Sequence, residues 1–273
     1  MNITFLGGGN MATALIGGLL KQAEPRPLIT VVDPSEGQRE RLAREFGVQT
    51  LAAPAPQAQA CDLLVLAVKP QQMREALLPL AAQARSALVV SVAAGIRCAD
   101  LSRWLGGHTR IVRSMPNTPA LIGAGITGLW AAPAVGEADR ALAEQVVRAV
   151  GEAVWVAEEP LLDAVTALSG SGPAYVFYFI EAMQAAGARL GLDPEAAARL
   201  TLATFRGAAA LAGAATVPVA TLREQVTSRG GTTAAALASM QSHGLAGRID
   251  EAMTAACRRA AELADEFGRD PQA

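Results

Sequence analysis

The first residues of the chain constrain its fold most strongly. Residues 2–6 form a short apolar run typical of a β-strand, and they lead directly into a glycine-rich turn and then an apolar pattern of helical period. Strand, glycine turn and helix in this order are the setting of the dinucleotide-binding fingerprint, in which Gly7 turns the chain and Gly9 lets a pyrophosphate approach. The candidate contacts are Gly7, Gly9, Asn10, Met11 and Ala12. By itself such a fingerprint is a weak signal, because an ordinary turn can have the same composition.

Further strand patterns alternate with helical ones through the first half of the chain. They cover residues 28–32, 61–68, 87–92, 110–114, 124–131 and 153–156, with a helical pattern from about residue 137 to 150. This alternation predicts an α/β fold with a Rossmann-type, doubly wound parallel sheet. Ligands of such sheets bind beyond the carboxyl ends of the strands, so the residues that follow the strands are candidate cofactor contacts. These are Ala67, Val68, Lys69, Ala94 and Asn117, whose amide would face a nicotinamide unless its loop is a simple turn.

Asp33, at the end of the second strand pattern, has two interpretations. An acidic residue at this place usually bonds the ribose hydroxyls of NAD and repels the phosphate of NADP. Asp33-Pro34-Ser35 also opens the next helical pattern, where an N-cap is expected. Both hold if Asp33 contacts ribose and Ser35 caps the helix. Because Arg39 and Arg41 follow closely in the sequence, the choice between NADPH and NADH stays open.

Composition argues against several other classes of protein. The 273 residues carry a net charge of −2 and include only two lysines, so the chain lacks the basic field that nucleic acids require. The three cysteines are far apart and odd in number, which predicts neither a disulfide framework nor a metal site. With no leader pattern and no apolar run long enough to span a bilayer, we expect a cytoplasmic protein without membrane or metal partners.

From residue 158 onward every long segment has a helical pattern. We therefore expect a dinucleotide-binding domain over residues 1–157 and an all-helical domain over residues 158–273. Asp193 and Pro194 predict a helix start, as N-cap and first helical residue. The helices between residues 173 and 215 carry more apolar surface than a small bundle can bury, which favours dimerisation.

The segment from Ser228 to Thr233 is the second candidate site. Two glycines and two threonines precede an alanine-rich run, which predicts a helix N-terminus capped by threonine. Unpaired amides and the helix dipole suit such an end to a small carboxylate or phosphate. A capped turn that binds nothing has the same pattern.

With these residues in hand, the chain resembles the pyrroline-5-carboxylate reductase family. The matching segments, in the family's order, are residues 7–12 (GGGNMA), 67–71 (AVKPQ), 115–119 (MPNTP), 163–175 (DAVTALSGSGPAY) and 226–233 (VTSRGGTT). The runs 169–175 and 228–233 are specific, whereas the glycine fingerprint is not.

The resemblance implies a Rossmann domain, a helical C-terminal dimerisation domain and often a decamer of five dimers. It also implies hydride transfer, usually from NADPH, that reduces 1-pyrroline-5-carboxylate to L-proline, the last step of proline biosynthesis. Ser228 and Thr233 would be the catalytic residues, with Thr232, Gly231, Glu159 and Gln225 holding or bordering the substrate, and the nicotinamide would lie between the domains.

Two departures from the family pattern stand out. Arg229 replaces a common proline before the glycines, and Pro54 stands near a common asparagine that contacts the adenosine end of the cofactor. The rival functions are a related imine or hydroxy-acid reductase and a non-catalytic dinucleotide sensor. Hydroxy-acid dehydrogenases of this plan typically need a lysine in the second domain, and no lysine follows Lys69.

Overall fold

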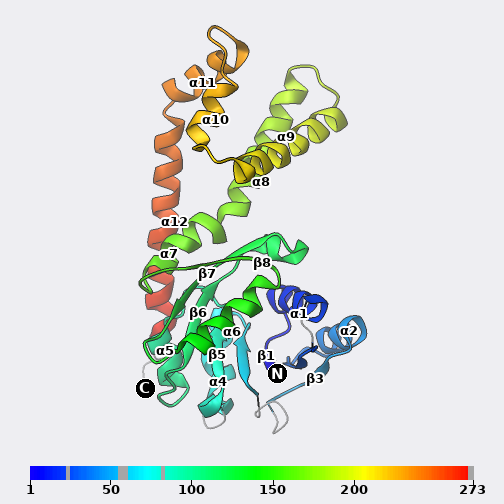
Figure 1. Cartoon of the computed structure of the whole chain (residues 1–273), viewed down its shortest axis with the longest axis vertical. Helices are drawn as coiled ribbons and strands as arrows, with labels where there is room; N and C mark the ends of the chain where they lie inside the picture. Colours follow the sequence, from blue (N-terminus) through cyan, green and yellow to red (C-terminus); the bar gives the residue numbers. More distant parts are fainter. Residues whose placement is uncertain (23–24, 55–60, 81–83, 270–273) are drawn as a thin grey trace. The chain divides into compact units, whose positions relative to one another are not determined.

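The computed structural model describes residues 1–22, 25–54, 61–80 and 84–269. It divides into two compact units, which are labelled by their elements in Figure 1. The first consists of Met1–Ser171 and Ala255–Ala273, and the second of Gly172–Thr254. The domain boundary expected after residue 157 stays a prediction. The compact units themselves divide after Ser171 and after Thr254.

The first unit is built on an eight-stranded sheet of order β3-β2-β1-β4-β5-β6-β7-β8. The strands are β1 (Asn2–Leu6), β2 (Leu28–Val32), β3 (Gln49–Leu51), β4 (Leu63–Leu66), β5 (Leu88–Ser91), β6 (Ile111–Met115), β7 (Gly125–Ala131) and β8 (Gly151–Trp155). Strand order reverses on the two sides of β1, which is the Rossmann-type arrangement expected from the sequence.

One strand pair departs from the expected parallel sheet. β7 runs antiparallel to β6, with Val112 opposite Ala131 and Met115 opposite Gly128. A parallel pair needs a long crossover, usually a helix, whereas only the short turn η3 (Thr118–Ile122) lies between these strands. The chain therefore reverses direction here, and β8 then returns parallel to β7.

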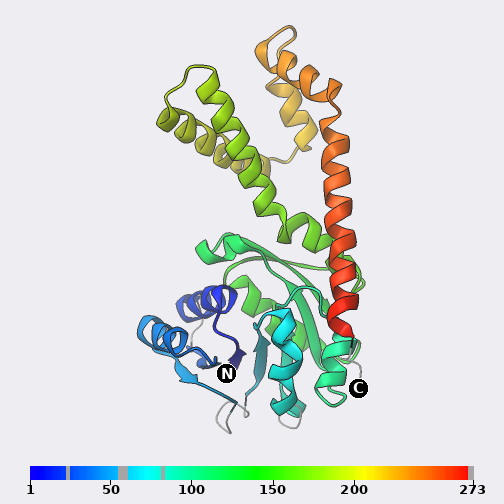
Figure 2. The ribbon, with the colours of Figure 1, turned by 180° about the vertical axis from the view of Figure 1, so that it is seen from behind.

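Helices cover both faces of the sheet. The helices that the structure describes in this unit, besides the end of α12 (Leu245–Gly268), are α1 (Asn10–Gln22), α2 (Glu36–Phe46), α4 (Pro70–Leu77), α5 (Cys98–Trp104), α6 (Glu137–Arg148) and α7 (Leu161–Val165), with short turns η1 (Leu78–Leu80), η2 (Ala84–Ser86) and the π-helical turn η4 (Thr166–Gly170). Alternate strand side chains point to opposite faces, so Phe5 and Val65 pack with α1, α2 and α6. Leu64 and Leu66 pack with α4 and α5 on the other face, which Figure 2 turns toward the viewer.

The second unit is entirely helical. It contains α8 (Gly172–Arg189), α9 (Pro194–Ala214), α10 (Val219–Gln225), α11 (Thr232–Ser242) and the start of α12 (Leu245–Gly268), whose later residues belong to the first unit. The predicted start of α9 is confirmed, because the Asp193 carboxylate accepts hydrogen bonds from the amides of Glu195 and Ala196. None of the helices in the described part of the chain combines the length and the apolar character that a membrane span needs.

Candidate functional site

The fingerprint turn is held at the point where β1, β2 and β4 end. Gly7 has a φ of 96°, and its amide donates to the Val32 carbonyl oxygen at 2.8 Å. A Cβ at Gly7 would lie 2.7 Å from the Ala67 carbonyl oxygen, closer than real side chains approach. Both the backbone conformation and the neighbouring strand therefore exclude every residue except glycine.

Gly9 differs from Gly7 because none of the residues that the structure describes requires a glycine there. A Cβ at Gly9 would meet no atom of the described residues within 4 Å, and Gly9 is exposed immediately before α1 begins at Asn10. The missing side chain leaves open space at a helix N-terminus, which suits a phosphate group. Ala12, by contrast, is fully buried between α1 and the sheet, as the fingerprint requires.

The Asp33 carboxylate makes contacts that neither sequence interpretation anticipated. Its Oδ2 accepts from the Gly8 amide at 2.8 Å, and its Oδ1 accepts from the Ser35 amide at 2.9 Å. Ser35 is the N-cap of α2, as expected, because its hydroxyl accepts from the Gln38 amide. Asp33 therefore holds the fingerprint turn in place as well as lying beside it.

The arginines after Asp33 fold back toward this turn. Arg39 donates from Nη1 to the carbonyl oxygens of Asp33 and Pro34, at 2.9 and 2.8 Å. Arg41 donates from Nη2 to the Thr13 hydroxyl at 2.8 Å. Two guanidinium groups thus bond to residues next to the fingerprint turn, one at the Asp33 and Pro34 carbonyl oxygens and one at Thr13 in α1. Positive and negative groups both lie in this region, so its charge favours neither NADH nor NADPH outright.

The remaining candidate cofactor residues follow strands that share one sheet edge. β1, β4, β5 and β6 are adjacent and parallel, so their carboxyl ends, with Ala67, Val68, Lys69, Ala94 and Asn117, lie along the edge that carries the fingerprint. Asn117 is partly committed, because its Oδ1 accepts from the Ile126 amide at 3.0 Å. A cofactor contact from Asn117 would therefore use its amide nitrogen.

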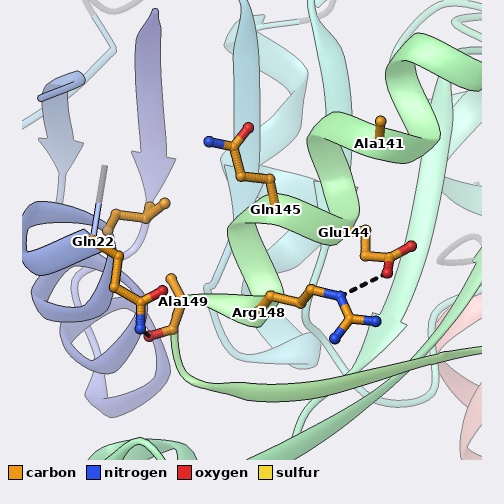
Figure 3. A pocket seen from close by; sticks show the side chains of 7 residues that line it. Gln22, Ala141, Glu144, Gln145, Arg148 and Ala149 are labelled. Carbon is orange, nitrogen blue, oxygen red and sulfur yellow. Dashed lines mark hydrogen bonds and ion pairs between the residues drawn. The ribbon is translucent and has the colours of Figure 1, made fainter. Parts of the chain in front are cut away.

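A separate hollow lies near the ends of α1 and α6 (Figure 3). It has a volume of about 530 Å³ and is lined by Leu19, Gln22, Ala141, Glu144, Gln145, Arg148 and Ala149. Arg148 donates to Glu144 at 2.7 Å along its wall. None of the predicted site residues lines this hollow, since it lies at the end of α1 away from the fingerprint.

Glu159 is engaged by a buried charged cluster that sequence reasoning missed. Its Oε1 accepts from the Cys98 amide at 2.7 Å and lies 3.3 Å from Nη1 of Arg113, whose side chain is 4% exposed. Nη2 of Arg113 lies 3.6 Å from the Asp163 Oδ1, and burial raises the pKa of that carboxyl. Burial also raises the pKa of the Cys98 thiol. The signal in the sequence that could have revealed this cluster is the charged Arg113 inside an otherwise buried strand, because a buried cation needs an acidic partner.

The second candidate site is the turn between α10 and α11. Gly230 has a φ of 72°, and Gly231 is the N-cap of α11, with Thr232 and Thr233 as the first helical residues. No side chain caps this helix, so the expectation that a threonine caps it was wrong. Thr232 and Thr233 lie inside the first turn, one and two positions after the N-cap. A side chain there cannot accept from the unpaired first-turn amides in the way that an N-cap side chain does.

This turn brings most of the predicted substrate residues together. Gln225 ends α10, and Ser228 accepts through its carbonyl oxygen from the Gly231 amide at 3.0 Å. Ser228 and Thr232 are exposed, and Thr233 is half-buried. The N-cap Gly231 brings no side chain to the first-turn amides of α11, and none of the described side chains caps them, so they suit a small anion. Glu159 belongs to the first unit. The described residues contain no cluster of side chains able to hold a metal ion.

Comparison with known proteins assigns both halves of the chain. Residues 159–263 match the family model described as pyrroline-5-carboxylate reductase dimerisation, and residues 2–95 match NADP oxidoreductase coenzyme F420-dependent. A pyrroline-5-carboxylate reductase from Pseudomonas aeruginosa is 46% identical over 268 residues, covering 98% of each chain. The chain belongs to the pyrroline-5-carboxylate reductase family.

Solved structures of pyrroline-5-carboxylate reductases have the same fold. The enzyme from Coxiella burnetii superposes with a TM-score of 0.91 at 41% identity, covering 96% of this chain and 98% of that one. The Plasmodium falciparum pyrroline carboxylate reductase, solved with NADP bound, gives a TM-score of 0.84 at 28% identity and covers 97% and 98%. Both similarities extend over the two units.

Proposed function

We propose that this chain reduces 1-pyrroline-5-carboxylate to L-proline with a hydride from NADPH or NADH. The full-length similarity to pyrroline-5-carboxylate reductases carries this proposal. When bound, the reduced dinucleotide would supply the hydride that the carbon of the C=N bond accepts. The ring nitrogen keeps the proton of an imine that is protonated before it binds, so the reaction needs no strong general acid.

The first unit would hold the dinucleotide at the edge that carries the fingerprint. The open space at Gly9 and the N-terminus of α1 suit the pyrophosphate, and Asp33 lies beside the turn where the ribose is expected. Lys69, Ala94 and Asn117 follow the neighbouring strands. These residues place the cofactor and restrict its motion, which is the protein's share of the rate enhancement.

The turn before α11 would hold the substrate. The first-turn amides and the helix dipole would bind the ring carboxylate, with Ser228 and Thr232 as hydroxyl donors. Thr233 would also reach the ring nitrogen. Gln225 would border the ring, and Arg229 adds a positive charge next to Ser228.

We also propose that this chain assembles into a homo-oligomer. We expect a dimer at least, formed through the second unit, and a decamer of such dimers is the larger assembly to test for. We place the enzyme in the cytoplasm, because its three cysteines are free thiols.

Thr233→Ala tests the substrate site against an ordinary turn. We expect kcat/KM for pyrroline-5-carboxylate to fall roughly ten- to a hundredfold, since a hydrogen bond to a charged group contributes about 1.5–3 kcal/mol. Stability should barely change, because Thr233 caps nothing. The assay follows oxidation of NADPH and of NADH with and without the substrate.

The matched control is Thr216→Ala, an exposed threonine in the connection between α9 and α10. It should leave kcat/KM unchanged, and cofactor affinity should stay constant in both variants. An unaltered kcat/KM in folded Thr233→Ala protein would show that the substrate does not bind at this turn. No substrate-dependent oxidation by the unmodified chain would refute the proposed activity itself.

A further inference from the structure

The connection between β5 and α5 is secured by residues far away in the sequence. It contains Ala94, at the sheet edge where the cofactor is expected, and it ends at Cys98, the first residue of α5. The N-cap residue Arg97 offers no side-chain cap to this helix. Instead, the Glu159 carboxylate accepts from the Cys98 amide at 2.7 Å. A carboxylate from another loop thus takes the place of a local cap.

The end of α12 holds the same connection from a second direction. Nη1 of Arg97 lies 2.7 Å from Oδ1 of Asp265. Gly95 has a φ of 71°, and a Cβ there would lie 3.2 Å from the ring of Phe267 and 3.3 Å from Leu263. Residues 94–98 are therefore held by Glu159 and by the end of α12, both within the first unit.

Arg113 determines where the Glu159 carboxylate sits. Its guanidinium is almost fully buried on β6, so it requires a negative partner close by. Nη1 donates to Glu159 at 3.3 Å, whereas Oδ1 of Asp163 lies 3.6 Å from Nη2 and has no hydrogen-bond partner among the described residues. One oxygen of Glu159 thus joins the buried cation to the first amide of α5.

We propose that Glu159 is a positioning residue for the cofactor, which sets the β5–α5 connection through the Cys98 amide and is itself oriented by Arg113. This inference rests on the proposed function. It assigns to Glu159 a role different from bordering the substrate, because its bonded oxygen is already used by Cys98 and Arg113. A shifted connection would move Ala94 relative to the other strand ends and weaken dinucleotide binding.

Glu159→Ala, with NADPH titrated onto the protein in the absence of substrate, tests this role. The Kd for NADPH should rise roughly tenfold, the lower end of the effect of losing one hydrogen bond to a charged group, because Glu159 acts on the cofactor through the connection and not by direct contact. Glu159→Gln keeps an acceptor for the Cys98 amide and should recover most of the affinity. Glu158→Ala, which removes an exposed neighbouring carboxylate, is the matched control and should leave the Kd unchanged.

Hydrogen exchange provides a readout that does not depend on turnover. In cofactor-free Glu159→Ala protein, the amides of residues 94–98 should exchange faster, while those of β1 keep their protection. If the alanine variant does not fold, the same two measurements on Glu159→Gln decide the question. There the exchange at Cys98 should change little, because an acceptor remains.

Two results would overturn the proposal. A raised KM for pyrroline-5-carboxylate with an unchanged Kd for NADPH would make Glu159 a substrate contact. A lowered melting temperature with unchanged Kd and KM would make it a purely structural residue. NADPH binding without substrate reduction by the unmodified chain would instead refute the proposed function, and the Kd measurement would still test the positioning role.

Discussion

The two compact units differ in what fills their interiors. In the first, apolar side chains from the sheet pack with helices on both faces, and residues such as Phe5, Leu15 and Leu66 have almost no exposure. In the second, only Ala197 and Thr201 are buried among the described residues. Large apolar side chains there are exposed, for example Phe177 at 64% and Leu190 at 86%. An apolar sequence therefore does not by itself provide a core.

This difference shows which unit depends on a partner. A sheet covered by helices on both faces buries its apolar surface within one chain, whereas a few helices leave theirs in water. Exposed apolar area of this kind marks an interface, and the family model that covers these helices describes dimerisation. We expect the second unit to gain its stability from a second copy of the chain.

The largest expected effect comes from Phe177→Glu on α8. A charge placed in an apolar interface should prevent assembly and leave aggregated or insoluble protein, because burying an unpaired carboxylate is strongly unfavourable. Light scattering and size-exclusion chromatography measure the change. Phe177→Leu is the control, since it keeps an apolar side chain and should assemble normally.

Dilution of the unmodified protein tests the same difference between the two units without a mutation. Amides of α8 and α9 should exchange faster as the oligomer dissociates, whereas amides of β1 and β4 should not respond. A stable, soluble monomer of the unmodified chain, with protected second-unit amides, would show that the two units do not differ in this way.

A smaller effect is expected from Asp33→Ser in the first unit. Removing the carboxylate relieves repulsion of a 2′-phosphate, so the ratio of kcat/KM for NADPH to that for NADH should rise several-fold. Both cofactors should also bind more weakly, because the Gly8 amide loses its acceptor. Steady-state kinetics with each cofactor measure the ratio. If affinity falls equally for both and the ratio stays constant, Asp33 serves only to hold the turn.

The smallest effect concerns His108, buried beside the sheet with Nε2 3.2 Å from the Arg110 carbonyl oxygen. Burial lowers the pKa of His108 below its ordinary value of 6.5. The unfolded chain then binds a proton at His108 more readily than the folded chain does. The stability that the neutral side chain contributes is therefore complete above pH 6.5 and is lost as the pH falls toward the folded-state pKa. His108→Gln should remove this part of the acid destabilisation. Melting curves between about pH 7.5 and pH 5 test it, and identical pH slopes for both proteins would contradict it.

Local patterns were sufficient for much of the fold. The run of residues 2–6, its glycine turn and the following helix were read correctly, and so were the caps at Ser35 and Asp193. These features depend on residues a few positions apart, whose conformations and hydrogen bonds are decided along the chain. The family resemblance rested on such segments too, and the comparisons confirmed it.

Contacts between distant residues were decided only by the tertiary structure. The antiparallel pairing of β6 with β7, the Asp33 carboxylate on the Gly8 amide and the link from Arg113 through Glu159 to Cys98 all join separate segments. No local pattern specifies them, because each depends on which strands become neighbours and which charge is buried with which. The sequence by itself determined the elements and the chemistry available, and packing determined which of those side chains meet.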